Sequence, residues 1–324
     1  FSSHSQNSCF SCPLFQISIL PRAPEMAGAL SHFNGRPTLL PISKSNPSRP
    51  SSYRPLIVNM AHNQSYWASI DADIESHLKK AIPIRPPVCV FEPMHHLAFA
   101  APPTTAPALC IAACELVGGH RDQAVAAASA LHLMHAASYT HEHLPLTDRP
   151  KPRPTISHAF NPNVELLTGD GIVPFGFELL ARSDDPAQKN SDRVLRVIIE
   201  ITRAVGSRGM VDGQFLQLQG GQSDGDMGWI EHVCKKKEGE LHACGAACGA
   251  ILGGGKEEEI EKLRKFGLYV GMIQGMVYGV GKNEKGLMEV MEKLRELALK
   301  ELESFNERKV EWISSIVEAN LCNV

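Results

Sequence analysis

Long stretches of helix-favouring sequence, with apolar residues recurring every three or four positions, constrain this chain most. Residues 122–139 (DQAVAAASALHLMHAASY) are rich in alanine and leucine, the residue types with high helix propensity. Over residues 284–305, Leu287, Met291 and Leu294 recur at helical spacing and mark one apolar face. No segment shows strand alternation, and no internal repeat is present. The sequence therefore predicts an all-α fold, a single-domain helical bundle.

The same reasoning places further helices along the body of the chain. They are expected over residues 65–78, 109–116, 163–182, 191–207, 242–252 and 257–277. Glycines at 118–119 and 253–255 stand where helices are expected to end. Residues 146–154 (LTDRPKPRP) contain three prolines in five positions and predict a loop, and residues 220–228 predict a flexible polar loop.

The first sixty residues differ in composition from the rest. They are rich in Ser and Pro, carry five Lys or Arg residues, and contain Glu25 as their single acidic residue. A basic, Ser-rich and acid-poor N-terminal segment is typical of a transit peptide, and an ordinary disordered tail is the alternative. We therefore expect a disordered leader over residues 1–60 that directs the chain to the plastid (chloroplast), and one helical domain over 61–324.

Charge, hydropathy and cysteine usage exclude several classes of function. The formal net charge is -3, so the chain lacks the polycationic character that nucleic-acid binding by counterion release requires. No run approaches the roughly 18 to 20 apolar residues of a membrane-spanning helix. The nine cysteines are an odd number scattered over the chain, which is a poor disulfide framework. We expect neither a nucleic-acid partner nor a membrane span.

Four of the cysteines form two pairs with identical spacing. Cys110 and Cys114, like Cys244 and Cys248, are separated by three residues that are mostly small, so each pair lies on one face of a helix. Three interpretations stay open at this point. They are a four-thiolate zinc site, a reversible disulfide in each pair, and close packing of two helices through small residues, within this chain or against another.

Several motifs carry a resemblance to a known family. Residues 109–119 (LCIAACELVGG) and 249–255 (GAILGGG) resemble the plant geranylgeranyl diphosphate synthases, a branch of the polyprenyl diphosphate synthases. Residues 167–171 (LTGDG) and 213–214 (GQ) resemble landmarks on the core helices of these enzymes, so that the resemblance covers about residues 71–305. It implies the isoprenoid (polyprenyl) synthase fold, with Mg²⁺ ions held between two aspartate-rich segments while an allylic diphosphate ionises.

The first of those segments has lost most of its acids. The family sequence His-Asp-Asp-Leu-Pro continues to a further aspartate. Here the two adjacent aspartates align with Glu142 and His143, and only Asp148 is retained. An imidazole is a softer ligand that suits Mg²⁺ poorly.

The second segment has lost all of its acids. Its aspartates align with Val277, Tyr278 and Gly281, and the basic run of the homoallylic substrate site aligns with residues 103–107 (PTTAP). Lys237 aligns with a lysine that contacts phosphate in the family and is a possible residual phosphate contact, although the run 235–237 otherwise predicts a solvated helix face. We therefore predict no catalytic residues, no metal site and no cofactor in this chain.

Lost aspartates combined with paired cysteine motifs resemble the non-catalytic small subunits of plant heteromeric geranyl diphosphate synthases. The resemblance implies a hetero-oligomer with a geranylgeranyl diphosphate synthase large subunit that supplies the Mg²⁺ site. It also implies that Cys110, Cys114, Cys244 and Cys248 contribute to the subunit interface. The predicted function is to shift the partner's product towards geranyl diphosphate for monoterpene and isoprenoid biosynthesis.

Three alternatives stay open. The first is a recruiting subunit that raises geranylgeranyl diphosphate output. The second is an independent prenyltransferase that uses Glu142, His143 and Asp148 with an unusual metal. The third is a metal-binding or redox interaction protein built on the four paired cysteines.

Overall fold

The computed structural model describes residues 56–145, 158–185, 187–219, 226–279, 286–305 and 307–321, and this part of the chain is helical without any strand. In chain order the elements are α1 (Leu56–Ala81), α2 (Val88–Ala100), α3 (Ala106–Leu116), α4 (Arg121–His143), α5 (Pro162–Ala181), α6 (Ser191–Val205), α7 (Met210–Gln219), α8 (Met227–Cys234), the π-helical turn η1 (Lys235–Gly239), α9 (Glu240–Gly253), α10 (Glu257–Tyr278), α11 (Leu287–Leu302) and α12 (Glu307–Leu321). The all-α prediction is confirmed.

Two short helices form the centre of the bundle. In α9 every residue from Leu241 to Leu252 is buried, and in α3 only Glu115 is not. Both helices are apolar on all sides, which is the pattern of a helix enclosed by others. Helices α4, α6 and α10 pack against α9, and α11 packs against the outer side of α10.

Glycine allows the central helices to approach closely. A Cβ atom on Gly249 would overlap the carbonyl oxygen of Cys110 in α3, and one on Gly245 would overlap that of Ala106. On the other side of α9, Gly267 of α10 lies against the carbonyl group of His242 in the same way. Because glycine has no side chain, these glycines allow the backbones of α3, α9 and α10 to lie in direct contact.

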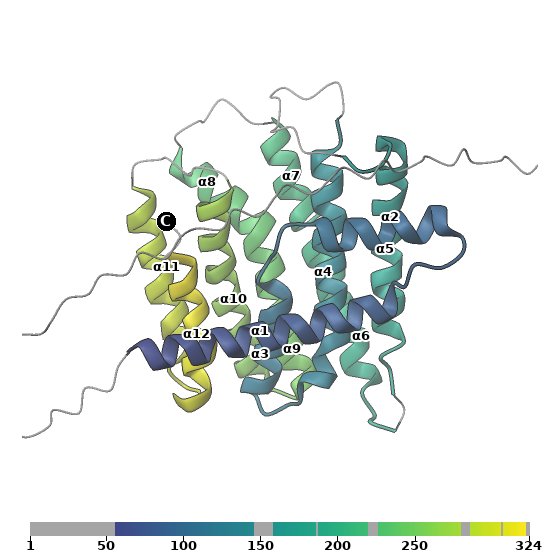
Figure 1. Ribbon diagram of the computed structural model, residues 1–324. Helices are drawn as coiled ribbons and strands as arrows, with labels where there is room; N and C mark the ends of the chain where they lie inside the picture. The colour runs from purple at the N-terminus through teal and green to yellow at the C-terminus, as the bar shows by residue number, and fades with distance from the viewer. Residues whose placement is uncertain are drawn as a thin grey trace, which may run out of the picture. The chain divides into compact units, whose positions relative to one another are not determined.

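Helix α1 lies across several other helices at one end of the bundle (Figure 1). The Tyr66 hydroxyl donates a hydrogen bond to Glu115 of α3 at 2.6 Å, and its ring stacks on Trp312 of α12 with centroids 4.9 Å apart. The Trp67 indole donates to the Ser315 hydroxyl at 3.0 Å. Aromatic side chains with polar ends thus attach α1 to both the centre and the C-terminal helix.

Several predicted boundaries need correction or lie outside the described residues. Helices α2, α7, α8 and α12 were not predicted, and α8 begins at Met227 inside the expected loop 220–228. The loop predicted over 146–154 lies outside the described residues, as does nearly all of the predicted leader, and α1 begins at Leu56. None of the described helices combines the length and apolarity that a membrane crossing needs.

Candidate functional site

The described positions that resemble the family's catalytic segments lie in the last turns of α4 and α10 and in the turn η1. Glu142 and His143 form the last turn of α4, and Val277 and Tyr278 form the last turn of α10. The turn η1 carries Lys237 to the same end of the bundle. Asp148 and Gly281 lie outside the described residues.

An internal ion pair joins two of these positions. The Lys237 ammonium lies 2.7 Å from Glu142 Oε1 and donates a second hydrogen bond of 2.7 Å to Gln217 Oε1 of α7. The side chains of Lys237 and Glu142 are only 17% and 13% exposed, so water screens their attraction little. The lysine that would contact a phosphate is thus paired within the chain. The predicted solvated face holds for Lys235, which is exposed, but not for Lys237.

The other three described positions offer little to a divalent metal. The His143 ring lies 4.0 Å from the Tyr139 ring, and its Nδ1 lies 2.8 Å from the Tyr139 carbonyl oxygen. Val277 is buried among apolar side chains, and Tyr278 is 58% exposed. Mg²⁺ prefers several hard oxygen ligands in an octahedral arrangement, and Glu142, the one carboxylate among these positions, is paired with Lys237. The donor set of the described positions does not fit Mg²⁺.

A buried polar network lies beside these positions. The Thr105 hydroxyl donates a 2.7 Å hydrogen bond to Gln274 Oε1. The His242 Nε2 atom lies 3.0 Å from Thr105 Oγ1 and 3.0 Å from Gln274 Oε1. The His242 Nδ1 atom lies 2.7 Å from the Glu238 carbonyl oxygen. Polar side chains that satisfy one another in this way fix the packing of α9, α10 and the start of α3. This network could not be predicted from the sequence, because its members are far apart in the chain.

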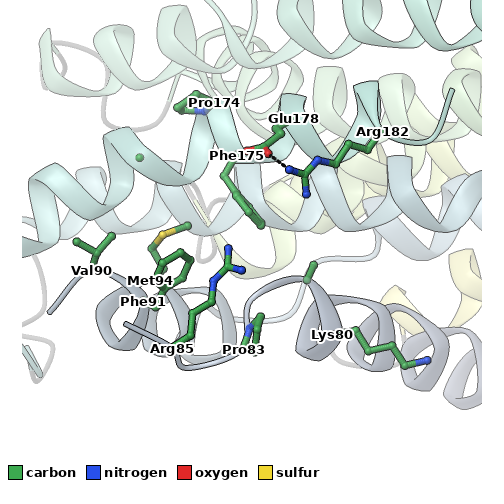
Figure 2. Close-up of a pocket in the computed structure, with 12 residues that line it drawn as sticks. Lys80, Pro83, Arg85, Val90, Phe91, Met94, Pro174, Phe175, Glu178 and Arg182 are labelled. Carbon is green, nitrogen blue, oxygen red and sulfur yellow. Dashed lines mark ion pairs between the residues drawn. The ribbon is translucent and has the colours of Figure 1, made fainter. Parts of the chain in front are cut away.

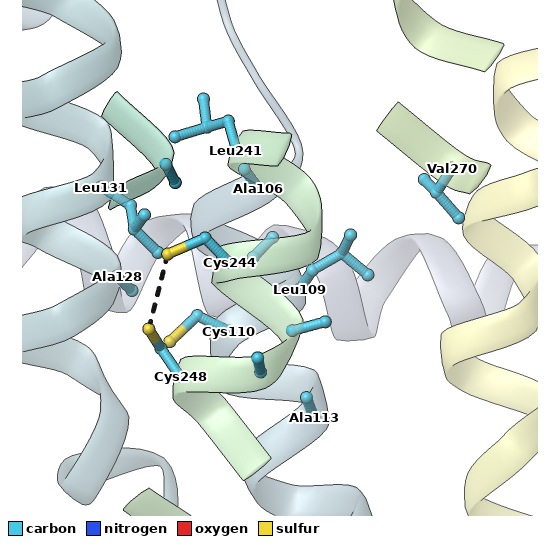
Figure 3. Packing of buried hydrophobic residues seen from close by; sticks show 14 of the residues in the cluster. Ala106, Leu109, Cys110, Ala113, Ala128, Leu131, Leu241, Cys244, Cys248 and Val270 are labelled. Carbon is cyan, nitrogen blue, oxygen red and sulfur yellow. Dashed lines mark hydrogen bonds between the residues drawn. The ribbon is translucent and has the colours of Figure 1, made fainter. Parts of the chain in front are cut away.

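The four paired cysteines are buried inside the bundle. Figure 3 shows Cys110, Cys244 and Cys248 where α3, α4 and α9 pack together. Their exposed fractions are 0% for Cys110, Cys114 and Cys248 and 2% for Cys244. The two sulfur atoms of α9 are 3.6 Å apart, and Cys114 Sγ lies 3.3 Å from the His120 carbonyl oxygen. Each thiol therefore contacts atoms of its own chain.

Burial determines the chemistry of these thiols. It raises the pKa of Cys110 and Cys248 well above the usual value and the pKa of Cys114 to about 12. The thiolate is the form that binds metals and attacks disulfides, so protonated buried thiols are poor at both. No group of three or more His, Cys, Asp or Glu side chains that could hold a metal occurs in the described part of the chain. The arrangement favours close packing over a zinc or redox site, and a role at a subunit interface stays a prediction.

Comparisons with known proteins agree with this geometry. The polyprenyl synthetase family pattern matches residues 89–274. A chloroplastic heterodimeric geranylgeranyl pyrophosphate synthase small subunit 2 from Cannabis sativa is 61% identical over 268 residues, which are 80% of this chain and 93% of the relative.

Two solved structures are similar in both sequence and fold. The geranyl diphosphate synthase small subunit from Antirrhinum majus is 62% identical with a TM-score of 0.75, and the match covers 79% of this chain and 98% of that one. A chain from the heterotetrameric geranyl pyrophosphate synthase of mint is 56% identical with a TM-score of 0.70, covering 78% and 98%.

Proposed function

Because the chain belongs to the polyprenyl synthetase family, we propose that it is a regulatory, catalytically incompetent small subunit that binds a geranylgeranyl diphosphate synthase large subunit. The ion pair between Lys237 and Glu142 carries the proposal. By the family resemblance, Glu142 occupies the position of a metal-binding acid and Lys237 that of a phosphate contact. In this chain the two side chains bind each other instead. Mg²⁺ and all bond-making chemistry then belong to the partner.

The relatives support assembly with a second kind of subunit. One is named as the small subunit of a heterodimeric synthase and another comes from a heterotetrameric one. The chain also exposes large apolar side chains on three consecutive helices: Val164, Leu166 and Leu167 on α5, Leu195 and Ile199 on α6, and Val211, Phe215 and Leu218 on α7. We call these eight residues the apolar surface. The three helices are neighbours in the bundle, since α6 contacts both α5 and α7. Exposed large apolar side chains are typical of protein interfaces, and we assign the large subunit to this surface.

A subunit without a metal site acts on product length only through its partner. Contacts at the apolar surface would change the conformation or dynamics of the large subunit, or narrow its elongation cavity, so that shorter products leave earlier. The paired cysteines contribute indirectly in this scheme, because they are buried and set the positions of α3 and α9. The expected result is more geranyl diphosphate from a partner that alone makes the twenty-carbon product.

A second candidate function is recruitment that raises geranylgeranyl diphosphate output without shortening it. The two relatives are named for different products. The Cannabis sativa protein is named for geranylgeranyl pyrophosphate, and the Antirrhinum majus protein for geranyl diphosphate. The two identities are nearly equal, at 61% and 62%. Sequence similarity therefore does not choose between the two products.

A product assay separates these functions. The purified chain, a geranylgeranyl diphosphate synthase large subunit and their mixture would each be incubated with isoprenyl diphosphates and Mg²⁺, and the products separated by chain length. We expect no turnover by the chain alone and a larger ten-carbon share from the mixture. Increased twenty-carbon output at an unchanged ratio would identify the recruiting function, and brisk turnover by the chain alone would refute catalytic incompetence.

We also assign the protein to the plastid. The relative from Cannabis sativa is described as chloroplastic, and the composition of residues 1–60 is that of a transit peptide. Import of a fluorescent fusion into isolated chloroplasts, compared with the same fusion without residues 1–60, tests this assignment.

A further inference from the structure

Helix α7 carries three residues of the apolar surface, and it has little apolar burial of its own. Val211, Phe215 and Leu218 recur at positions i, i+4 and i+7 and are 50%, 56% and 40% exposed, so they form one stripe along the helix. Of the ten residues of α7, only Met210 and Gly213 are buried. A helix with so few buried apolar contacts is weakly fixed by the core.

The other two helices of the apolar surface are fixed by apolar packing. Helix α6 buries Val194, Val197 and Ile201 against its neighbours. Helix α5 buries Ile172, and its Phe175 side chain extends towards α2, against which α5 packs (Figure 2). The core itself therefore positions the apolar side chains that α5 and α6 expose, whereas α7 needs another means of support.

Polar side chains connect α7 to α4. The Gln214 amide donates a hydrogen bond of 2.7 Å to the Ser138 hydroxyl of α4. The Lys237 ammonium donates hydrogen bonds of 2.7 Å to Gln217 Oε1 of α7 and to Glu142 Oε1 of α4. Lys237 thus links α7 to the last turn of α4, and bonds that involve a charged group are among the stronger ones.

The turn η1 supports α7 along the same side. A Cβ atom on Gly213 would lie 2.7 Å from Lys237 Cγ and 2.8 Å from Lys236 Cβ, so the backbone of α7 lies directly on the stems of these two lysines. The Lys236 ammonium donates a 2.6 Å hydrogen bond to the Arg208 carbonyl oxygen and lies 3.6 Å from the Asp212 carboxylate. The anchored side of α7 is distinct from the side that carries the exposed apolar stripe.

We propose that the remnants of the catalytic segments now hold α7 in the position that the large subunit binds. Glu142 and Lys237, together with Gln214 and Gln217, are positioning residues of the interface. This inference rests on the proposed function, because it takes the large subunit as the protein that the stripe on α7 contacts. A helix that is in its binding position for only part of the time binds its partner more weakly in the same proportion.

Hydrogen exchange of the full chain tests whether these bonds hold α7. The variant Gln214→Ala/Gln217→Ala removes both glutamine side chains from α7, and alanine favours a helix at least as strongly as glutamine. We expect the amides of residues 214–219 to exchange at least tenfold faster, since one neutral and one charge-assisted hydrogen bond are lost. The amides of α9 should exchange at the wild-type rate. Unchanged exchange in α7 would overturn the proposal.

Binding to a tagged large subunit tests whether the position of α7 matters to the partner. We expect the Kd of the double alanine variant to rise about tenfold. The variant Gln214→Ala/Gln217→Glu returns an oxygen acceptor to Lys237 and should recover part of the affinity and part of the exchange protection. Phe215→Ala removes a contact from the stripe itself, so it should weaken binding without faster exchange in α7.

The matched control is Gln219→Ala, which makes the same change at an exposed position of the same helix and should alter neither exchange nor binding. Melting curves establish that each variant is folded. Faster exchange in α7 with an unchanged Kd would overturn the proposal, and so would a Kd that Phe215→Ala leaves unchanged. A wild-type chain that does not bind the large subunit would refute the proposed function as well, whereas these variant results would refute the positioning role alone.

Discussion

At the scale of single residues, a lysine and a glutamate that bind each other are the physical basis of the proposed catalytic incompetence. By the family resemblance, one of these positions binds a metal ion and the other contacts a phosphate group. Here Lys237 and Glu142 bind each other at 2.7 Å in a mostly buried position. A charge that is already paired in a poorly hydrated place has little attraction left for a diphosphate.

Removing one member of this pair should destabilise the chain. Lys237→Met leaves the Glu142 carboxylate poorly hydrated, and we expect a loss of about 2 kcal/mol in the free energy of unfolding. The double variant with Glu142→Gln should lose less than the sum of the two single variants, because the second change removes the stranded charge. Urea unfolding measures all three, and Lys79→Met, which breaks an exposed pair with Glu75, should cause no measurable change. Additive losses would show that the two side chains act independently.

Partly buried histidines make the stability depend on pH. Burial lowers the pKa of His77, His132 and His135 below the usual 6.5. His132 and His135 contact the carbonyl oxygens of Ala98 and Pro102. The unfolded chain binds protons at these sites from about pH 6.5 downwards, before the folded chain does. Their contribution to stability is therefore complete above pH 6.5 and is lost as the pH falls through the lower folded values.

Unfolding curves at pH 7.5, 6.5 and 5.5 check this dependence. We expect the free energy of unfolding to fall between pH 6.5 and 5.5, and to fall less in the His135→Gln variant, which carries no titrating group at that position. A stability that rises towards pH 5.5 would contradict the neutral, buried state of these rings.

At the scale of helices, the close approach of α3, α9 and α10 depends on glycine. Gly249→Ala introduces a methyl group where the Cys110 carbonyl oxygen already lies, and helix backbones cannot move apart without loosening the whole centre. We expect the free energy of unfolding to fall by about 3 kcal/mol, which is at the upper end of the range for overpacking. Gly171→Ala is the matched control, since its methyl group meets open space within a helix, and it should be neutral or slightly stabilising. Thermal unfolding of both variants distinguishes an effect of tight packing at Gly249 from a general sensitivity to replacing glycine within a helix.

The packing of the paired cysteines also predicts their reactivity. Of the cysteines in the described residues, only Cys89 is exposed, whereas Cys110, Cys114, Cys244 and Cys248 are buried. A variant in which Cys9, Cys12 and Cys322 are replaced by serine should show one fast thiol with a disulfide reagent in the native state. All six remaining thiols should react after denaturation. Thiols missing in the denatured state would indicate disulfides, and zinc that copurifies with the protein would indicate a metal site.

At the scale of the whole molecule, the apolar surface on α5, α6 and α7 is expected to hold the large subunit. Leu167 and Leu195 are 70% and 58% exposed, so a charge at either position costs the isolated chain little. Leu167→Asp and Leu195→Asp should therefore keep the melting temperature of the chain but weaken copurification with a tagged large subunit at least tenfold. Met288→Asp on α11, at a position that is 56% exposed, should leave assembly intact. Equal effects of all three changes would refute this location.

The sequence predicted some features of this protein and not others. Ala- and Leu-rich composition and apolar spacing predicted most of the helices, since helix propensity and amphipathicity are local properties. Composition and spacing did not predict α2, which contains Pro93, the short helices α7 and α8, or α12, because tertiary contacts stabilise such segments. Residue types at aligned positions likewise identified Glu142 and Lys237 as remnants of a site, but not the bond between them, which joins residues 95 positions apart.

The order of residues by itself determined the helical class, the family and the loss of the acids, because each depends on which residue type stands at which position. Only the tertiary structure decided that Lys237 is neutralised internally and that the paired cysteines are enclosed by their own chain. These facts depend on distances between segments remote in sequence, and such distances are set by how all the helices pack together.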